Sequence, residues 1–390
     1  MNMYDYLNWR GDLTFKQSPF NDVDNLLFCY AIYTDLSEVL KENEVVTIKE
    51  ACDRLFALHT EEEFLSVHSL IAQAPVVLHR MSETERFGNV KISHYVNEVK
   101  DDIPLQFSAA HFEIDKHTAY IAIAGTDDTV TGWKEDFQMS YKTVAAQERA
   151  AEYVNSTISP FRKYYLGGHS KGGSLAVYAA TQATNSTLHR LIKVYSNDGP
   201  GLSPYAYDQK GYDSIKDRIV KIVPEMSVFG MLFDNHEEKM VVKSSYNYFY
   251  EHDATSWQII GTTFEKGTPA PEVELIQTGL NTFLDSMDLE ERAAFVDEVF
   301  MAFRKADINR ISDINKKKLQ SLRKLLKEFV KINEDAKKAF ANLVVIYGKL
   351  VKDKAEGAIF NRIKTVSEFM NDLVTTETAN IKNLKTKNRE

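Results

Sequence analysis

A serine lies between glycines in the run YLGGHSKGG at residues 165–173. Gly168 and Gly172 stand two positions on either side of Ser170, where a tight turn leaves no room for a Cβ atom. The preceding residues are aromatic-rich and strand-like, and residues 174–180 have the small and apolar spacing of a helix packed on a sheet. The pattern predicts a strand-to-helix turn that presents a nucleophilic serine, with an ordinary turn as the alternative.

A serine hydroxyl is a weak nucleophile near neutral pH, so Ser170 needs a base within hydrogen-bond reach and a carboxylate to orient that base. Chains with this turn carry serine, acid and histidine in that order. Of the three downstream histidines, we expect His189 on the surface and His236 in a solvated acidic stretch. His252 follows a strand-like aromatic segment and is expected in a loop at the carboxyl edge of the sheet. It is the predicted general base, with a turn cap as the alternative.

The candidate acids are Asp198, Glu225 and Asp234, all of which precede His252 and satisfy the chain order. Asp198 is the favoured acid, because its turn is rich in glycine and proline and its strand is expected to adjoin that of the nucleophile. Glu225, at the end of the next strand, is the alternative acid. A turn-forming carboxylate that bonds nearby backbone N–H groups is the non-catalytic interpretation of Asp198.

Acyl transfer also needs donors for the oxyanion, and one is normally the backbone N–H that follows the nucleophile, here Lys171. The second donor is expected from the loop after an earlier strand, where Thr126 follows Gly125. Thr126 offers both a backbone N–H and a hydroxyl, while a plain turn is the structural alternative. The Lys171 side chain is expected to be solvated, the alternative being a positive charge at the pocket mouth that favours anionic head groups.

The composition is that of a globular protein with a sizeable core: 390 residues, 44% of them hydrophobic and 11% aromatic. A formal net charge of −9 argues against a nucleic-acid partner. The two cysteines, Cys29 and Cys52, are expected to be core thiols, and the scattered histidines imply no metal site. The polar N-terminus shows neither a signal peptide nor a membrane-spanning segment, so we expect a cytoplasmic protein.

Strand-like and helical patterns alternate through the middle of the chain. Alternation of this kind predicts an α/β fold, with a mostly parallel central sheet wrapped by helices and preceded by N-terminal helices. The expected helices span residues 21–40, 48–58, 61–72 and 145–157, and the expected strands span residues 90–96, 106–112, 118–124, 163–166, 193–196 and 219–223.

The pattern changes near residue 285 to long helical periods without strand-like alternation. We therefore expect two regions, a catalytic domain at residues 1–275 and an all-helical extension at residues 285–390. Residues 304–354 carry 15 Lys and Arg against 6 Asp and Glu, beside an apolar stripe of leucine, phenylalanine, valine and isoleucine at residues 319–332. A solvated basic face on a bundle helix is one interpretation, and a surface for anionic lipid or a partner helix is the other.

Several motifs together resemble known hydrolases. The segments AGT at 124–126, WKEDF at 133–137 and GHSKGG at 168–173 resemble the class 3 lipase pattern. The chain looks more closely like the Mbeg-like family of uncharacterised bacterial α/β-hydrolases over residues 1–260. The segments that carry this second likeness are LNWRGDL at 7–13, PFNDVD at 19–24, NDGPG at 197–201 and EHDATSW at 251–257.

The resemblance implies an α/β-hydrolase fold with a lipase-like core. It carries over Ser170 as nucleophile, His252 as base, and Thr126 with Lys171 as oxyanion donors. Class 3 lipases place an aspartate near the strand that corresponds to residues 218–223, where this chain has Pro224 and Glu225. The resemblance to class 3 lipases therefore does not supply the acid, and residues beyond 285 match no motif.

These observations predict a serine hydrolase that cleaves carboxylic esters of acyl or lipid type through an acyl-enzyme and requires no cofactor. The expected partners are a small-molecule or lipid ester and, through the basic C-terminal helices, an anionic membrane surface; no oligomeric state is predicted. A peptidase or thioesterase on the same machinery is one alternative. Another is a catalytically silent scaffold that uses the basic helical region, because a fold does not guarantee activity.

Overall fold

The computed structural model describes residues 1–66, 69, 71–100, 102–127, 129–227, 229–233, 237–271, 273, 277, 287–306 and 308. The chain divides into two compact units. The first contains Met1–Val273 and holds every candidate catalytic residue. The second contains helix α12 (Leu289–Lys305), which begins with a capping box formed by Asp288 and Glu291.

An eight-stranded sheet with strands in sequential order forms the centre of the first unit. Neighbours from β1 to β4 pair antiparallel, and those from β4 to β8 pair parallel. The strands are β1 (Val46–Thr47), β2 (Lys91–Lys100), β3 (Leu105–Glu113), β4 (Thr118–Ile123), β5 (Lys163–His169), β6 (Leu191–Asn197), β7 (Ile219–Pro224) and β8 (Lys239–Val242). A separate two-stranded sheet pairs β9 (Ile259–Ile260) with β10 (Thr263–Phe264).

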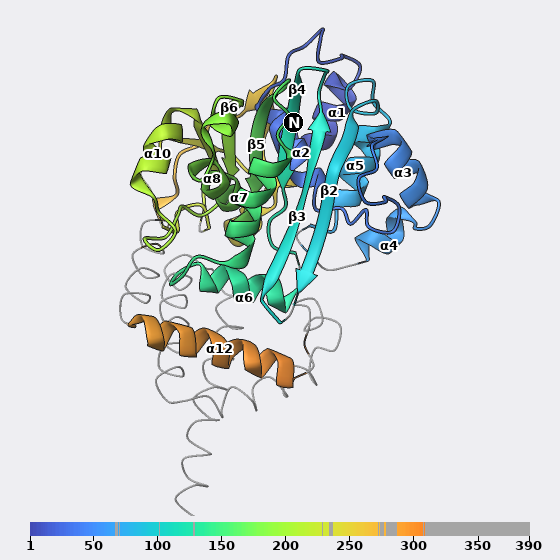
Figure 1. The fold of residues 1–390 in the computed structure, drawn as a ribbon. Helices are drawn as coiled ribbons and strands as arrows, with labels where there is room; N and C mark the ends of the chain where they lie inside the picture. Colours follow the sequence, from blue (N-terminus) through green and yellow to red (C-terminus); the bar gives the residue numbers. More distant parts are fainter. Residues whose placement is uncertain are drawn as a thin grey trace, which may run out of the picture. The chain divides into compact units, whose positions relative to one another are not determined.

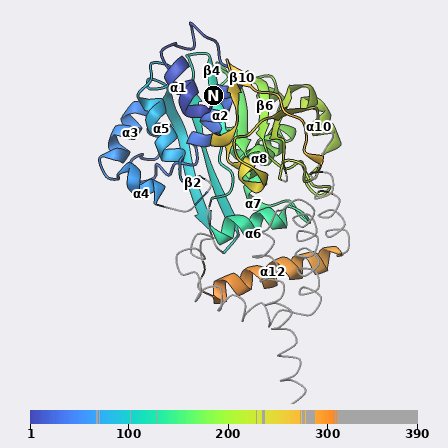
Figure 2. The ribbon, with the colours of Figure 1, turned by 180° about the vertical axis from the view of Figure 1, so that it is seen from behind.

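Helices cover both faces of the sheet, which Figures 1 and 2 show from opposite sides. Alternate residues of β4 divide between two cores: Tyr120 and Ala122 pack on the N-terminal helices, and Ile121 and Ile123 pack on helices of the other face. The N-terminal helices are α1 (Met3–Arg10), α2 (Asp22–Ala31), α3 (Ile48–Phe56), α4 (Glu61–Leu65) and α5 (Ala74–Ser82). The later ones are α6 (Val130–Gln138), α7 (Ala145–Thr157), α8 (Lys171–Thr181), α9 (Asn185–Leu188) and α10 (Gln209–Ile215).

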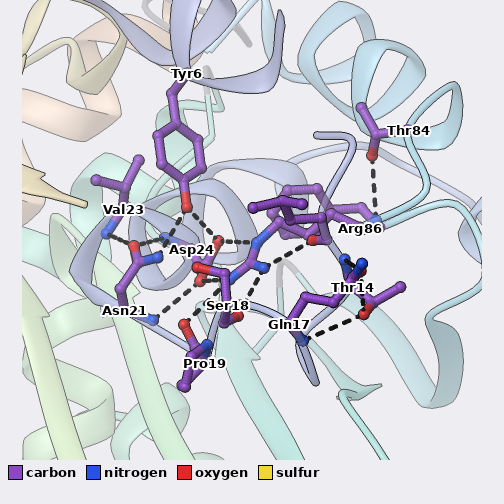
Figure 3. Close-up of polar contacts among 12 residues, drawn as sticks. Tyr6, Thr14, Gln17, Ser18, Pro19, Asn21, Val23, Asp24, Thr84 and Arg86 are labelled. Atoms are coloured by element: carbon purple, nitrogen blue, oxygen red, sulfur yellow. Dashed lines mark hydrogen bonds and ion pairs between the residues drawn. The ribbon is translucent and has the colours of Figure 1, made fainter. Parts of the chain in front are cut away.

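A buried ion pair anchors α2 beside the sheet (Figure 3). The Arg86 guanidinium donates to both carboxylate oxygens of Asp24 at 2.8 and 2.5 Å, and both side chains are fully buried. Asp24 also accepts from the Tyr6 hydroxyl and caps the start of α2 together with Asn21. Removing one partner of such a pair leaves an uncompensated buried charge, which costs about 3–5 kcal/mol.

From this anchored helix a chain of amides reaches the strand ends at the serine turn. Asn25 donates to the side chain of Asn197 at 2.9 Å, and Asn197 donates to the Gly168 carbonyl at 3.1 Å. Both asparagines are fully buried. The first bond joins α2 to the end of β6, the second joins β6 to β5, and together they hold the two strand ends in place against α2. The N-terminal helices therefore support the turn that carries Ser170.

The α/β-hydrolase fold expected from the sequence is confirmed, and the helix expected at residues 145–157 is α7 (Ala145–Thr157). Two other helix predictions were too long, because α2 ends at Ala31 and α4 ends at Leu65. The prediction of core thiols is confirmed, since Cys29 and Cys52 are buried and free. Across the described ranges, no helix is long and apolar enough to span a membrane.

Candidate active site

Ser170 occupies a strained turn between β5 and α8. Its φ of 57° and ψ of −133° lie in a region that L-residues rarely adopt. A Cβ atom on Gly168 would lie 2.2 Å from the backbone of Gly172, and one on Gly172 would lie 2.2 Å from the Ile123 carbonyl oxygen. The turn thus has the geometry of a nucleophile elbow, and both flanking positions require glycine.

His252 lies beside this turn at the end of a short 3-10 helix, Tyr248–His252. The strand expected from the aromatic residues before it is therefore wrong, and a second 3-10 helix, Ala254–Ser256, follows the histidine after one residue. The His252 ring packs 4.4 Å from the Phe229 ring and 4.6 Å from the ring of His169, the residue that precedes the serine. These contacts place the imidazole next to the elbow.

Asp198 meets the imidazole directly. Its Oδ2 lies 2.6 Å from His252 Nδ1, and its Oδ1 accepts from the Ser227 hydroxyl and from the Gly230 N–H at 3.2 Å. A hydrogen bond from Nδ1–H to the carboxylate fixes the tautomer whose lone pair is on Nε2, the nitrogen that can accept a proton. Asp198 itself has a φ of 49° and follows the end of β6, which adjoins β5.

The alternative acid is engaged elsewhere. Glu225 follows the end of β7 and accepts from the Thr268 N–H at 3.0 Å through Oε1. Asp234 and His236 lie outside the described residues, and His189 is exposed as expected. Of the two described candidate acids, it is therefore Asp198 that the fold brings to the imidazole.

The serine hydroxyl makes no direct bond to the imidazole. Within the described chain, no hydrogen bond joins Ser170 Oγ to His252, and Ser170 is partly exposed. Catalytic hydrogen bonds of this kind often tighten only when substrate binds. The arrangement therefore provides a serine at an accessible turn and an oriented imidazole that packs on the preceding residue, His169.

Sequence reasoning missed two residues that hold His252 in position. His169 Nε2 lies 2.8 Å from the His252 carbonyl oxygen, and the Tyr33 hydroxyl lies 3.1 Å from His169 Nδ1. Burial lowers the pKa of His169 to about 3, so its ring is neutral and donates through Nε2 to that carbonyl. The sequence signal available for this role is the place of His169 directly before the serine in the elbow motif.

The two predicted oxyanion donors flank the elbow. A Cβ atom on Gly125 would lie 2.5 Å from the His169 carbonyl and 3.2 Å from the Ser170 Cβ, so the Thr126 loop packs directly on the turn. Neither the Thr126 N–H nor the Lys171 N–H has a hydrogen-bond partner among the residues that the structure describes. The Thr126 hydroxyl donates to Asp136 Oδ2 at 2.5 Å, which fixes the threonine rotamer.

The expectation of a solvated Lys171 side chain is wrong. Lys171 is 2% exposed, and its Nζ donates to Gln106 Oε1 at 2.9 Å and to Glu135 Oε2 at 3.0 Å. Because the first turn of α8 faces β3 and α6, the lysine stem runs into the protein instead of toward the pocket mouth. As for metals, no three His, Cys, Asp or Glu side chains gather as ligands in the described ranges.

Comparison with known proteins adds a family and a similar solved structure. No curated protein matches the sequence. The crystal structure of M37 lipase is 15% identical and matches with a TM-score of 0.30, covering 53% of this chain and 68% of that one. The Mbeg1-like family model matches residues 81–301. Because this segment is more than half of the chain, the protein belongs to the Mbeg1-like family.

Proposed function

We propose that this protein is a serine hydrolase that cleaves carboxylic esters of acyl or lipid type through an acyl-enzyme intermediate. The α/β-hydrolase fold supports a hydrolase-type function. The observation that carries the proposal is the 2.6 Å contact between Asp198 and His252 beside a serine held at a φ of 57°. Serine, acid and histidine also follow in the chain order of α/β-hydrolases.

In the proposed reaction, His252 Nε2 takes the proton from Ser170 Oγ while that oxygen attacks the ester carbonyl carbon. The negative charge on the carbonyl oxygen is stabilised by the backbone N–H groups of Thr126 and Lys171. His252 then protonates the departing alcohol, which leaves an acyl group on Ser170. A water molecule, deprotonated by His252, hydrolyses this ester and restores the free serine.

The proposal predicts measurable turnover of simple esters by the full-length chain. We expect saturable release of p-nitrophenol from p-nitrophenyl acetate, butyrate and decanoate, and the preferred chain length will report the acyl class. The matching thioester and anilide serve as comparisons for the thioesterase and peptidase alternatives. A folded chain, verified by circular dichroism, that turns over none of these compounds above the buffer rate would favour a catalytically silent scaffold.

The membrane contact expected from the basic C-terminal region remains a prediction. That region, residues 304–354, lies almost entirely outside the described residues, as does most of the extension at 285–390. It contributes nothing to the catalytic proposal, which rests on the first compact unit.

A further inference from the structure

The residue that follows the candidate nucleophile is a buried charge. Lys171 begins α8 directly after Ser170, and its side chain is almost completely removed from water. Its Nζ lies 3.0 Å from Glu135 Oε2 and 3.7 Å from Asp136 Oδ1, both on α6. A buried ion pair stabilises a fold little more than apolar residues of similar volume would, so stability alone does not explain a lysine here.

Glu135 ties the lysine to three parts of the fold. Besides Lys171, its carboxylate accepts from the Ala146 N–H at 2.9 Å, in the first turn of α7, and from the Gln106 N–H at 3.3 Å, on β3. Glu135 is fully buried, so these donors are what stabilises its charge. The Lys171 ammonium is therefore held in one position relative to β3, α6 and α7.

Asp136 extends the same cluster to the other side of the oxyanion site. Its Oδ2 accepts from the Thr126 hydroxyl, and its Oδ1 is shielded from solvent with no hydrogen-bond partner among the described residues. The Lys171 ammonium is the cation that faces this oxygen. One cluster, in which Lys171 and Glu135 are buried and Asp136 is partly exposed, thus joins the two residues proposed to donate to the oxyanion, Lys171 and Thr126.

We propose that Lys171 is a positioning residue that holds both halves of the oxyanion hole in register, through Glu135 and Asp136. The inference rests on the proposed function, because an oxyanion hole matters only if Ser170 attacks a carbonyl. Donors must lie within a few tenths of an ångström of their working position to stabilise the developing charge. Loss of the ammonium lets the Thr126 loop and the start of α8 shift independently.

The test compares Lys171→Met with Lys221→Met in the full-length protein. Lys221 is a matched control: it is equally buried, pairs with Glu237 at 3.5 Å and lies on β7, which β6 separates from the nucleophile strand β5. With p-nitrophenyl butyrate as substrate, we expect Lys171→Met to lower kcat by about 10- to 100-fold, while KM stays within about twofold of the wild-type value. This is a part of the kcat loss that deleting a whole oxyanion donor causes. Lys221→Met should retain the wild-type kcat even if its thermal unfolding midpoint falls as much as that of Lys171→Met.

A pH profile separates positioning from simple destabilisation. Removal from water raises the pKa of Asp136 to about 6, and the positive charge of Lys171 opposes that rise. The other titratable groups facing the cluster are Glu135, Asp127 and Tyr33. Protonated Asp136 no longer holds the Thr126 hydroxyl as an ionic acceptor, so activity should fall as the pH drops through this pKa.

Without the Lys171 charge, the pKa of Asp136 rises further, and the acid limb of kcat/KM in Lys171→Met should move to higher pH. Asp136→Asn in the same background should remove that shift. Equal kcat losses in Lys171→Met and Lys221→Met would overturn the positioning role. So would a Lys171→Met enzyme with the wild-type kcat and an unmoved acid limb. Either result would leave the proposed function standing. A wild-type chain without any turnover would overturn the proposed function, and the positioning role with it.

Discussion

Replacement of Ser170 by alanine is expected to lower kcat for ester hydrolysis by about 10⁶-fold, to the residual rate that binding and the oxyanion donors give alone. The loss is this large because no other group at the elbow can form the acyl-enzyme. The measurement is p-nitrophenol release under saturating substrate. The substitution removes one partly exposed oxygen, so the fold should be unaffected.

Ser174→Ala is the matched control for that substitution. Ser174 lies on α8 four residues after the nucleophile and is fully buried, and its hydroxyl has no hydrogen-bond partner among the described residues. Its removal should change kcat by less than about twofold. Retention of activity within tenfold in Ser170→Ala would show that the esterase reaction does not proceed through this serine.

The second large effect is expected for Asp198→Asn, with a loss in kcat of about 10⁴-fold. Asn preserves the shape of the side chain and tolerates the positive φ of this position, so the backbone should remain as it is. The amide, however, offers its N–H₂ group or a weaker acceptor to His252 Nδ1. The imidazole is then no longer held in the tautomer that can take the serine proton.

Glu225→Gln discriminates between the two candidate acids. Glu225 interacts with the backbone near Thr268, and the 2.6 Å contact to His252 belongs to Asp198. Its substitution should leave kcat within about threefold of wild type. An active Asp198→Asn enzyme together with an inactive Glu225→Gln enzyme would reverse the assignment of the acid.

Local sequence patterns predicted the sheet and the elbow because these depend on short-range physics. Runs of alternating or continuous apolar residues indicated β2 to β7, and the glycines around Ser170 are forced by contacts within the turn itself. The preference for Asp198 over Glu225 also came from the sequence, since a strand next to the nucleophile strand was expected to end there. In the structure the Asp198 carboxylate contacts His252, and its role as the acid stays a prediction.

Other features depend on long-range packing that one sequence does not display. The aromatic residues before His252 have strand propensity, yet the chain there forms a 3-10 helix. Lys171 reads as a surface residue by type, and its burial depends on Glu135, which is 36 residues away. Likewise, the contacts of Tyr33 with His169 bring together segments more than a hundred residues apart.

The most direct measurement of the central claim is covalent labelling of the full-length protein with a fluorophosphonate, followed by mass spectrometry of its peptides. A fluorophosphonate reacts with serines that an adjacent base activates. The account predicts one adduct, located on Ser170, with labelling lost in Ser170→Ala and strongly slowed in Asp198→Asn. A folded protein that stays unlabelled, or that is labelled equally in Ser170→Ala, would contradict the account.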